Sequence, residues 1–71
     1  MPLRPLRARE ITRKLEHGGF ALRRQRGSHA RYVHPDGRGA TVPMHPGDVP
    51  VPVIRAILGQ TGLSEEEWER L

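Results

Sequence analysis

The residues with the clearest potential for chemistry lie close together, at positions 23–29 of this 71-residue chain. Three arginines, one serine and one histidine fall within these seven positions, and Gly27 separates the arginines from Ser28 and His29. Guanidinium groups bind phosphate oxygens through paired hydrogen bonds, and an imidazole can accept or donate a proton near neutral pH. The segment therefore predicts a site that binds a phosphate group and moves a proton.

Charge is distributed unevenly along the chain. Residues 1–45 carry ten arginines and lysines against three carboxylates, a net charge of +7, whereas residues 46–71 have a net charge of −3. Eleven of the twelve basic residues are arginine, the side chain best suited to bidentate phosphate contacts. A basic first part with an acidic end favours a polyanionic partner such as a nucleic acid.

Composition limits the classes of protein that fit. The length predicts a single domain, 1–71, with a thin core. The chain has no cysteine, which excludes disulfides and thiolate metal sites, and its four histidines lack metal-binding spacing. Its apolar runs are much shorter than the roughly 20 residues of a membrane span, and no secretory signal is apparent. We expect a cytoplasmic protein that needs no membrane, metal or small-molecule cofactor.

The hydrophobic pattern predicts an α+β domain. Apolar residues recur at helical spacing before Gly18 and again after Pro52, and three short strands with period-two alternation lie between them. A three-stranded antiparallel meander with both helices on one face, a two-layer sandwich, is expected. The expected elements are a helix at 7–17, strands at 20–25, 29–34 and 39–43, a proline-rich loop at 43–52, a helix that begins at Pro52 and ends by 59–62, and a short last helix after the capping box Ser64–Glu67.

Strand alternation assigns side chains to the two faces of the sheet. Arg23, His29 and Arg31 are expected on the open face or its rim, because neighbouring residues of a strand point to opposite sides. This places the histidine among arginines and outside the core. The side chains expected beneath the helices are Phe20, Leu22, Ala30 and Tyr32.

Several short segments match, in order, those of a known family; they are 19–20, 24–29 with Tyr32, 34–37, 41–45, 55–58, 62–64 and 67–68. With them the chain resembles, from about Leu6 to Leu71, the HicA-type toxins, small ribonucleases of HicA–HicB toxin–antitoxin pairs that are also grouped with YcfA-like proteins. The resemblance implies a fold like a double-stranded-RNA-binding domain, cleavage of mRNA, a catalytic histidine at His29 and inhibition by a HicB-like antitoxin.

These observations lead to one candidate site. Neutral His29 could take the proton of a ribose 2′-hydroxyl, so that this oxygen attacks the adjacent phosphate, while Arg24 or Arg26 stabilises the developing charge. Arg38 is a further candidate for a contact with the RNA backbone. The expected RNA-binding residues are Arg23, Arg24, Arg26, Gly27, Ser28, Arg31 and His45.

Other interpretations of the same residues stay open at this point. Ser28 could hydrogen-bond the turn backbone, and His29 and His45 could be ordinary surface histidines. The whole domain could be a non-catalytic RNA-binding module of the double-stranded-RNA-binding type, or its open sheet face could dock a protein. Cleavage of RNA by the wild type but not by His29→Ala would separate a nuclease from both alternatives.

Overall fold

The computed structural model describes residues 3–71, and it confirms the α+β architecture. Strands β2, β3 and β4 form an antiparallel sheet in that order, and β1 and β5 form a separate two-stranded pair. The order α1–β2–β3–β4–α2 is that of a double-stranded-RNA-binding-domain-like fold. The elements are β1 (Leu6–Arg7), α1 (Ala8–His17), β2 (Ala21–Arg26), β3 (His29–Val33), β4 (Gly39–Pro43), β5 (Asp48–Val49), α2 (Val51–Thr61) and α3 (Glu65–Arg70).

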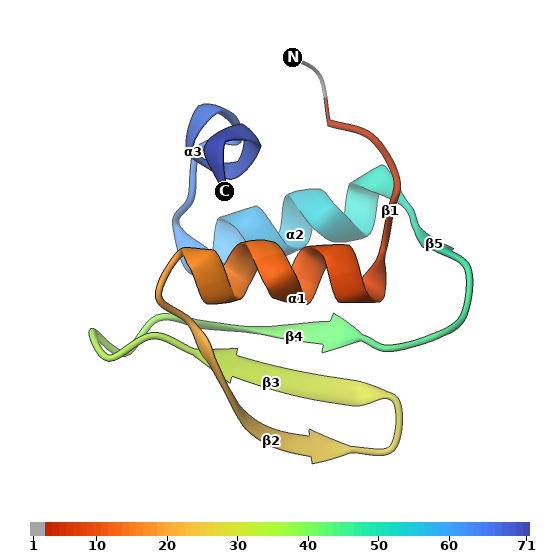
Figure 1. The fold of residues 1–71 in the computed structure, drawn as a ribbon, viewed down its shortest axis with the longest axis horizontal. Coiled ribbons are helices and arrows are strands. Elements are labelled where there is room, and N and C mark those ends of the chain that lie inside the picture. The colour runs from red at the N-terminus through yellow and green to blue at the C-terminus, as the bar shows by residue number, and fades with distance from the viewer. Residues whose placement is uncertain (1–2) are drawn as a thin grey trace.

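The two long helices cover only part of the sheet. Both α1 and α2 pack against β4, and β2 is the strand farthest from them (Figure 1). Among the described residues no helix lies on the other face of the sheet, as the sequence predicted. No helix within residues 3–71 has the length and apolarity required to cross a membrane.

Helix α1 forms because its apolar residues lie on one side. Ile11 and Leu15, one helical turn apart, are both completely buried, while the charged residues around them face solvent. At its start the Glu10 carboxylate accepts a hydrogen bond of 3.0 Å from the Arg7 N–H, which satisfies one main-chain donor. Gly19 follows with a φ of +92°, a conformation that favours glycine, and turns the chain into the sheet.

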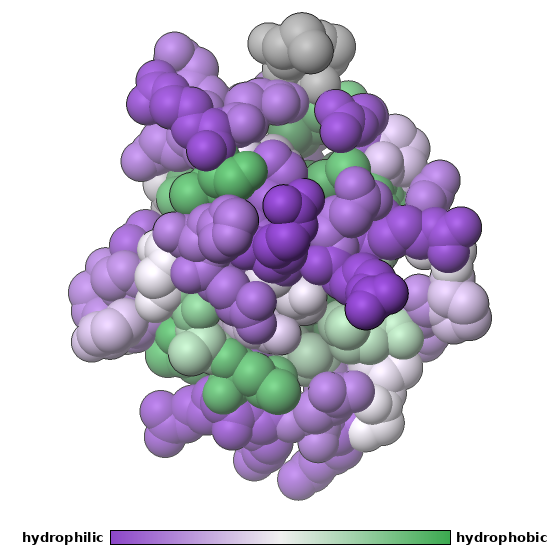
Figure 2. Space-filling model, in the orientation of Figure 1, coloured by the Kyte–Doolittle hydropathy of each residue, from purple (hydrophilic) through white to green (hydrophobic). Residues whose placement is uncertain are grey.

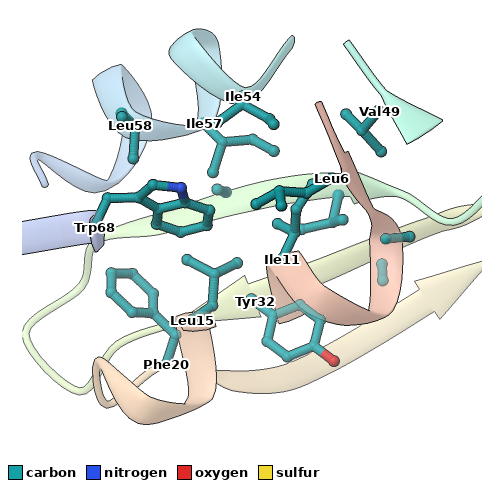
Figure 3. Close-up of a cluster of buried hydrophobic side chains, with 14 residues drawn as sticks. Leu6, Ile11, Leu15, Phe20, Tyr32, Val49, Ile54, Ile57, Leu58 and Trp68 are labelled. Atoms are coloured by element: carbon teal, nitrogen blue, oxygen red, sulfur yellow. The ribbon is translucent and has the colours of Figure 1, made fainter. Parts of the chain in front are cut away.

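The core lies between the helices and the covered face of the sheet (Figure 3). Ala30 and Tyr32 point into it from β3, as alternation predicted. Trp68 of α3 enters the same cluster and is 2% exposed. Lys14 Nζ donates to the carbonyls of Trp68 and Leu71, at 2.9 and 3.3 Å, and so ties α3 to α1.

The expected capping box at the start of α3 is confirmed. The Glu67 N–H donates to Ser64 Oγ at 3.1 Å, and the Ser64 N–H donates to the Glu67 carboxylate at 2.9 Å. These bonds to its ionised form hold the pKa of Glu67 below its usual range. The cap fixes the angle at which Trp68 enters the core.

Three sequence predictions were wrong in detail. Leu22 is 49% exposed, because β2 lies beyond the reach of the helices. The segment 43–52 is not entirely a loop, since β5 within it pairs with β1. Helix α2 begins at Val51, so that Pro52 is its second residue and not its first.

Candidate nucleic-acid interface

A β-bulge in β2 decides which side chains face the open side of the sheet. Leu22 pairs with Tyr32, whereas the next pair is Arg24 with Arg31, so that Arg23 is an extra residue in β2. Beyond a bulge the alternation of side chains shifts by one position. Arg24 therefore lies on the open face, although strict alternation from Leu22 would have placed it on the helix side.

The same register places the predicted catalytic histidine among arginines. His29 pairs with Arg26, and side chains of paired residues lie on the same face of a sheet. Arg31 lies two residues further along β3, on that face and beside Arg24. Both His29 and Arg31 are exposed, which confirms that the sequence placed them correctly outside the core.

Two shallow hollows on the open face share Arg24 and Arg31 and are therefore neighbours. One hollow also contains Arg23 and Val33, and the other also contains Arg26, His29 and Thr41 of β4. We call five charged or titratable residues of this region the arginine surface: Arg23, Arg24, Arg26, His29 and Arg31. Thr41 was not among the predicted site residues, although its place between Ala40 and Val42 on the third strand was the signal for it.

The guanidinium groups of the arginine surface are not neutralised by carboxylates. Among residues 3–71 the ion pairs involve other arginines, and no Asp or Glu lines either hollow. Arg31 Nη1 lies 3.4 Å from Thr41 Oγ1, a long hydrogen bond that leaves most of its donors free. A concentration of unpaired positive charge favours an anion with several acceptor oxygens.

The β2–β3 turn fixes the position of His29 at the end of its strand. Gly27 has a φ of +59°, as the first central residue of a type II′ hairpin turn requires. The Met44 N–H donates to the Ser28 carbonyl, and Gln25 Nε2 donates to the Gly27 carbonyl at 3.3 Å. Within residues 3–71 the Ser28 hydroxyl makes no hydrogen bond, so its expected bond to the turn backbone is not found.

His45 does not join the arginine surface. The chain leaves the sheet after Pro43, and His45 lines a different hollow near the start of α1, together with Arg7 and Arg9. Arg7 Nε in turn lies 3.5 Å from Asp48 Oδ1. The structure thus separates two histidines that the sequence had assigned to one RNA-binding site.

Arg38 has a structural role in this molecule. Its guanidinium donates to the Asp36 carboxylate at 2.8 Å and to the Thr61 carbonyl at 2.7 Å, and it lies 5.3 Å from the centre of the Phe20 ring. The Arg38 main-chain N–H also donates to Asp36, and these bonds hold the pKa of that carboxyl below its usual range. Arg38 therefore joins the β3–β4 connection to the end of α2, and its guanidinium already has partners within the fold.

Residues 3–71 contain no group of three or more histidine, aspartate or glutamate side chains arranged to hold a metal ion. The chemically active groups that line the two hollows are an imidazole, several guanidiniums and the hydroxyl of Thr41. Together they can bind a phosphate and exchange a proton with a bound molecule.

Comparison with known proteins places these features in a family. No curated protein matches the chain. The family model for the HicA toxin of bacterial toxin–antitoxin systems matches residues 8–63, which is well over half of the sequence. The matched region runs from α1 to α2 and includes the whole arginine surface. The chain therefore belongs to the HicA toxin family of bacterial toxin–antitoxin systems.

Proposed function

We propose that this toxin is an endoribonuclease that cleaves mRNA at the arginine surface, without a metal ion, and that His29 is its catalytic residue. The observation that carries the proposal is the position of His29. Its imidazole is exposed on the open face, opposite Arg26 and two residues from Arg31. Family membership supplies the context, since a toxin needs an activity that its antitoxin can restrain.

The reaction follows from the groups that surround the histidine. Neutral His29 accepts the proton of a ribose 2′-hydroxyl, and the 2′ oxygen forms a bond to the adjacent phosphorus. The bond from phosphorus to the 5′ oxygen breaks, and this oxygen takes up a proton. Arg24 and Arg31 stabilise the negative charge on the non-bridging oxygens. The products are a 2′,3′-cyclic phosphate and a 5′-hydroxyl.

The rest of the arginine surface holds the RNA strand. Arg23 and Val33 extend the site along the sheet, and Arg26 lies beside the turn. A side chain added at Gly27 would meet no atom within 4 Å, so the turn leaves room for an RNA backbone to approach. The Ser28 hydroxyl is available to donate to a phosphate oxygen.

His45 takes a more distant place in this proposal. Its hollow also contains Arg7 and Arg9, so it would contact RNA outside the nucleotides that react. We therefore assign it to RNA binding and not to protonation of the leaving oxygen.

The restraining partner is proposed to be a HicB-like antitoxin that covers the arginine surface. Acidic side chains on that protein would neutralise the guanidiniums that otherwise bind phosphate. Toxin and antitoxin would meet in the cytoplasm, where mRNA is available.

The test uses purified toxin and a single-stranded RNA oligonucleotide with no added metal. We expect His29→Ala to lower the cleavage rate by about 10²–10⁴-fold and to leave the fold intact. His17→Ala is the matched control, because His17 is exposed at the far end of α1 and should not affect the rate. Equal cleavage by wild type and His29→Ala, or products with a 5′-phosphate, would refute the mechanism. RNA that is bound but never cut would instead favour a non-catalytic RNA-binding module.

A further inference from the structure

The two outer edges of the main sheet differ in their capacity to accept another strand. At the β4 edge the Thr41 N–H donates to Gln60 Oε1 of α2 at 3.4 Å. Pro43, two residues along, faces the same way and has no N–H to offer. Helix α2 and a proline therefore block this edge.

The β2 edge has no comparable cover, and all six of its residues are exposed. Because the Thr41 N–H points away from β3, the residue opposite it, Arg31, directs its main-chain groups toward Arg24. Alternation then leaves the N–H and C=O groups of Leu22 and Gln25 directed away from β3. These are the main-chain groups that an added strand would bind.

The side chains of this edge combine one apolar residue with several charges. Leu22 is the one large apolar side chain that is exposed within residues 3–71. Arg23, Arg24 and Arg26 lie on the same strand without a carboxylate partner. Figure 2 shows an apolar patch over the strands of the sheet that is bordered by hydrophilic side chains. An added strand would therefore need both carboxylates and an apolar side chain.

A second copy of this chain does not meet that requirement. Pairing β2 with β2 of another copy would bring two sets of three arginines together, and like charges on adjacent strands are destabilising. The extra residue at the bulge also limits the length over which any regular ladder can form. The edge is therefore suited to a short, acidic strand.

We propose that an extended acidic segment of the antitoxin adds to the β2 edge as a fourth strand. Its main chain binds Leu22 and Gln25, an apolar side chain packs on Leu22, and its carboxylates pair with the arginines. This inference rests on membership of a toxin–antitoxin family and not on ribonuclease activity. Because Arg24 and Arg26 also line the arginine surface, this strand would exclude an anion from it.

The test compares two substitutions at one position, in the toxin and in its complex with the antitoxin. Gln25→Pro removes an outward N–H but leaves the β2–β3 ladder intact, as prolines on edge strands do. Gln25→Ala keeps the N–H and is the matched control, since both variants lose the side-chain bond to Gly27. We expect Gln25→Pro to weaken antitoxin binding by about tenfold or more, and Gln25→Ala by less than about threefold.

Amide hydrogen exchange gives a second measurement on the same complex. The Leu22 and Gln25 amides should become protected when wild-type toxin binds antitoxin, and Thr41 should keep the protection it has in the free protein. Thermal unfolding of Gln25→Pro establishes that the variant is folded, and none of these measurements depends on RNA cleavage.

Three outcomes would overturn the proposal. Equal antitoxin affinity for Gln25→Pro and Gln25→Ala would show that the outward N–H is not bound. Protection of Leu22 and Gln25 in a homodimer of free toxin would identify a second copy as the occupant. Protection of these amides by an RNA oligonucleotide but not by antitoxin would assign the edge to RNA.

Discussion

Strand β3 contributes residues both to the hydrophobic core and to the open face of the sheet. Ala30 and Tyr32 are 1% and 6% exposed and belong to the core, whereas His29 and Arg31 between and beside them lie on the open face. Neighbouring residues thus lie alternately in the core and on the open face, because a strand directs successive side chains to opposite sides. The stability of the fold and the proposed activity of the open face should therefore be separable, even by substitutions one residue apart.

The largest expected effect tests whether an apolar side chain stabilises the fold only where the helices cover it. Leu15→Ala and Leu22→Ala remove the same atoms, but Leu15 is completely buried and Leu22 is 49% exposed. We expect Leu15→Ala to lower the free energy of unfolding by about 2–5 kcal/mol and Leu22→Ala by no more than about 0.5 kcal/mol. Urea denaturation followed by circular dichroism measures both values. Similar losses for the two variants would contradict the position of β2 beyond the helices.

The second prediction concerns the open face. The double variant Arg24→Gln/Arg31→Gln should reduce the slope of log affinity for single-stranded RNA against log salt by about 1.4, because two phosphate contacts are lost. Its free energy of unfolding should stay within about 0.5 kcal/mol of wild type. Arg55→Gln is the control, since Arg55 is exposed on α2 and pairs with Glu65 at 3.5 Å. Fluorescence anisotropy over a salt series gives the slopes, and an unchanged slope would remove the arginine surface from the RNA site.

The smallest effect is a loss of stability in acid that originates at two exposed carboxylates, Asp36 after β3 and Glu67 in α3. The folded structure lowers the pKa of Asp36 and Glu67, so both carboxylates stabilise the fold above the pKa of the unfolded chain, near pH 4. That stabilisation is lost as pH falls through the lower pKa of the folded state.

The variant Asp36→Asn/Glu67→Gln isolates this effect. Its melting temperature should change less between pH 5 and about pH 3 than that of the wild type, because two of the groups that titrate differently on unfolding are gone. Differential scanning fluorimetry over this range makes the comparison. Parallel curves would mean that other carboxylates cause the acid sensitivity.

Local signals explain why most of the fold could be predicted from the sequence. The end of α1 before Gly18, the turn at Gly27 and the strand at 39–43 all lie where short-range patterns predicted them. The β1–β5 pair had no such signal, because each strand is two residues long and the partners lie some 40 residues apart. Only the folded chain brings Leu6 beside Val49.

The sequence indicated which residues come together at the arginine surface better than it indicated how they are arranged. The residues of the arginine surface do come from the segment 23–31. The face of the sheet on which each side chain lies depends on the bulge at Arg23, and side-chain alternation does not reveal that bulge. Strict alternation would have put Arg24 on the helix side and Gln25 on the open face. The distance of His45 from the arginine surface could not be predicted, since sequence distance from a strand end says little about the direction of the following loop.

The blocked β4 edge has a consequence for the protein at high concentration. If a second copy is added at the one open edge of the sheet, the outer edge of the enlarged sheet is blocked. Strand addition therefore stops after the first step. Fibres grow by repeating the same addition without limit. Pro43 and Gln60 thus prevent such growth and leave the exposed β2 edge as the one that can accept a strand.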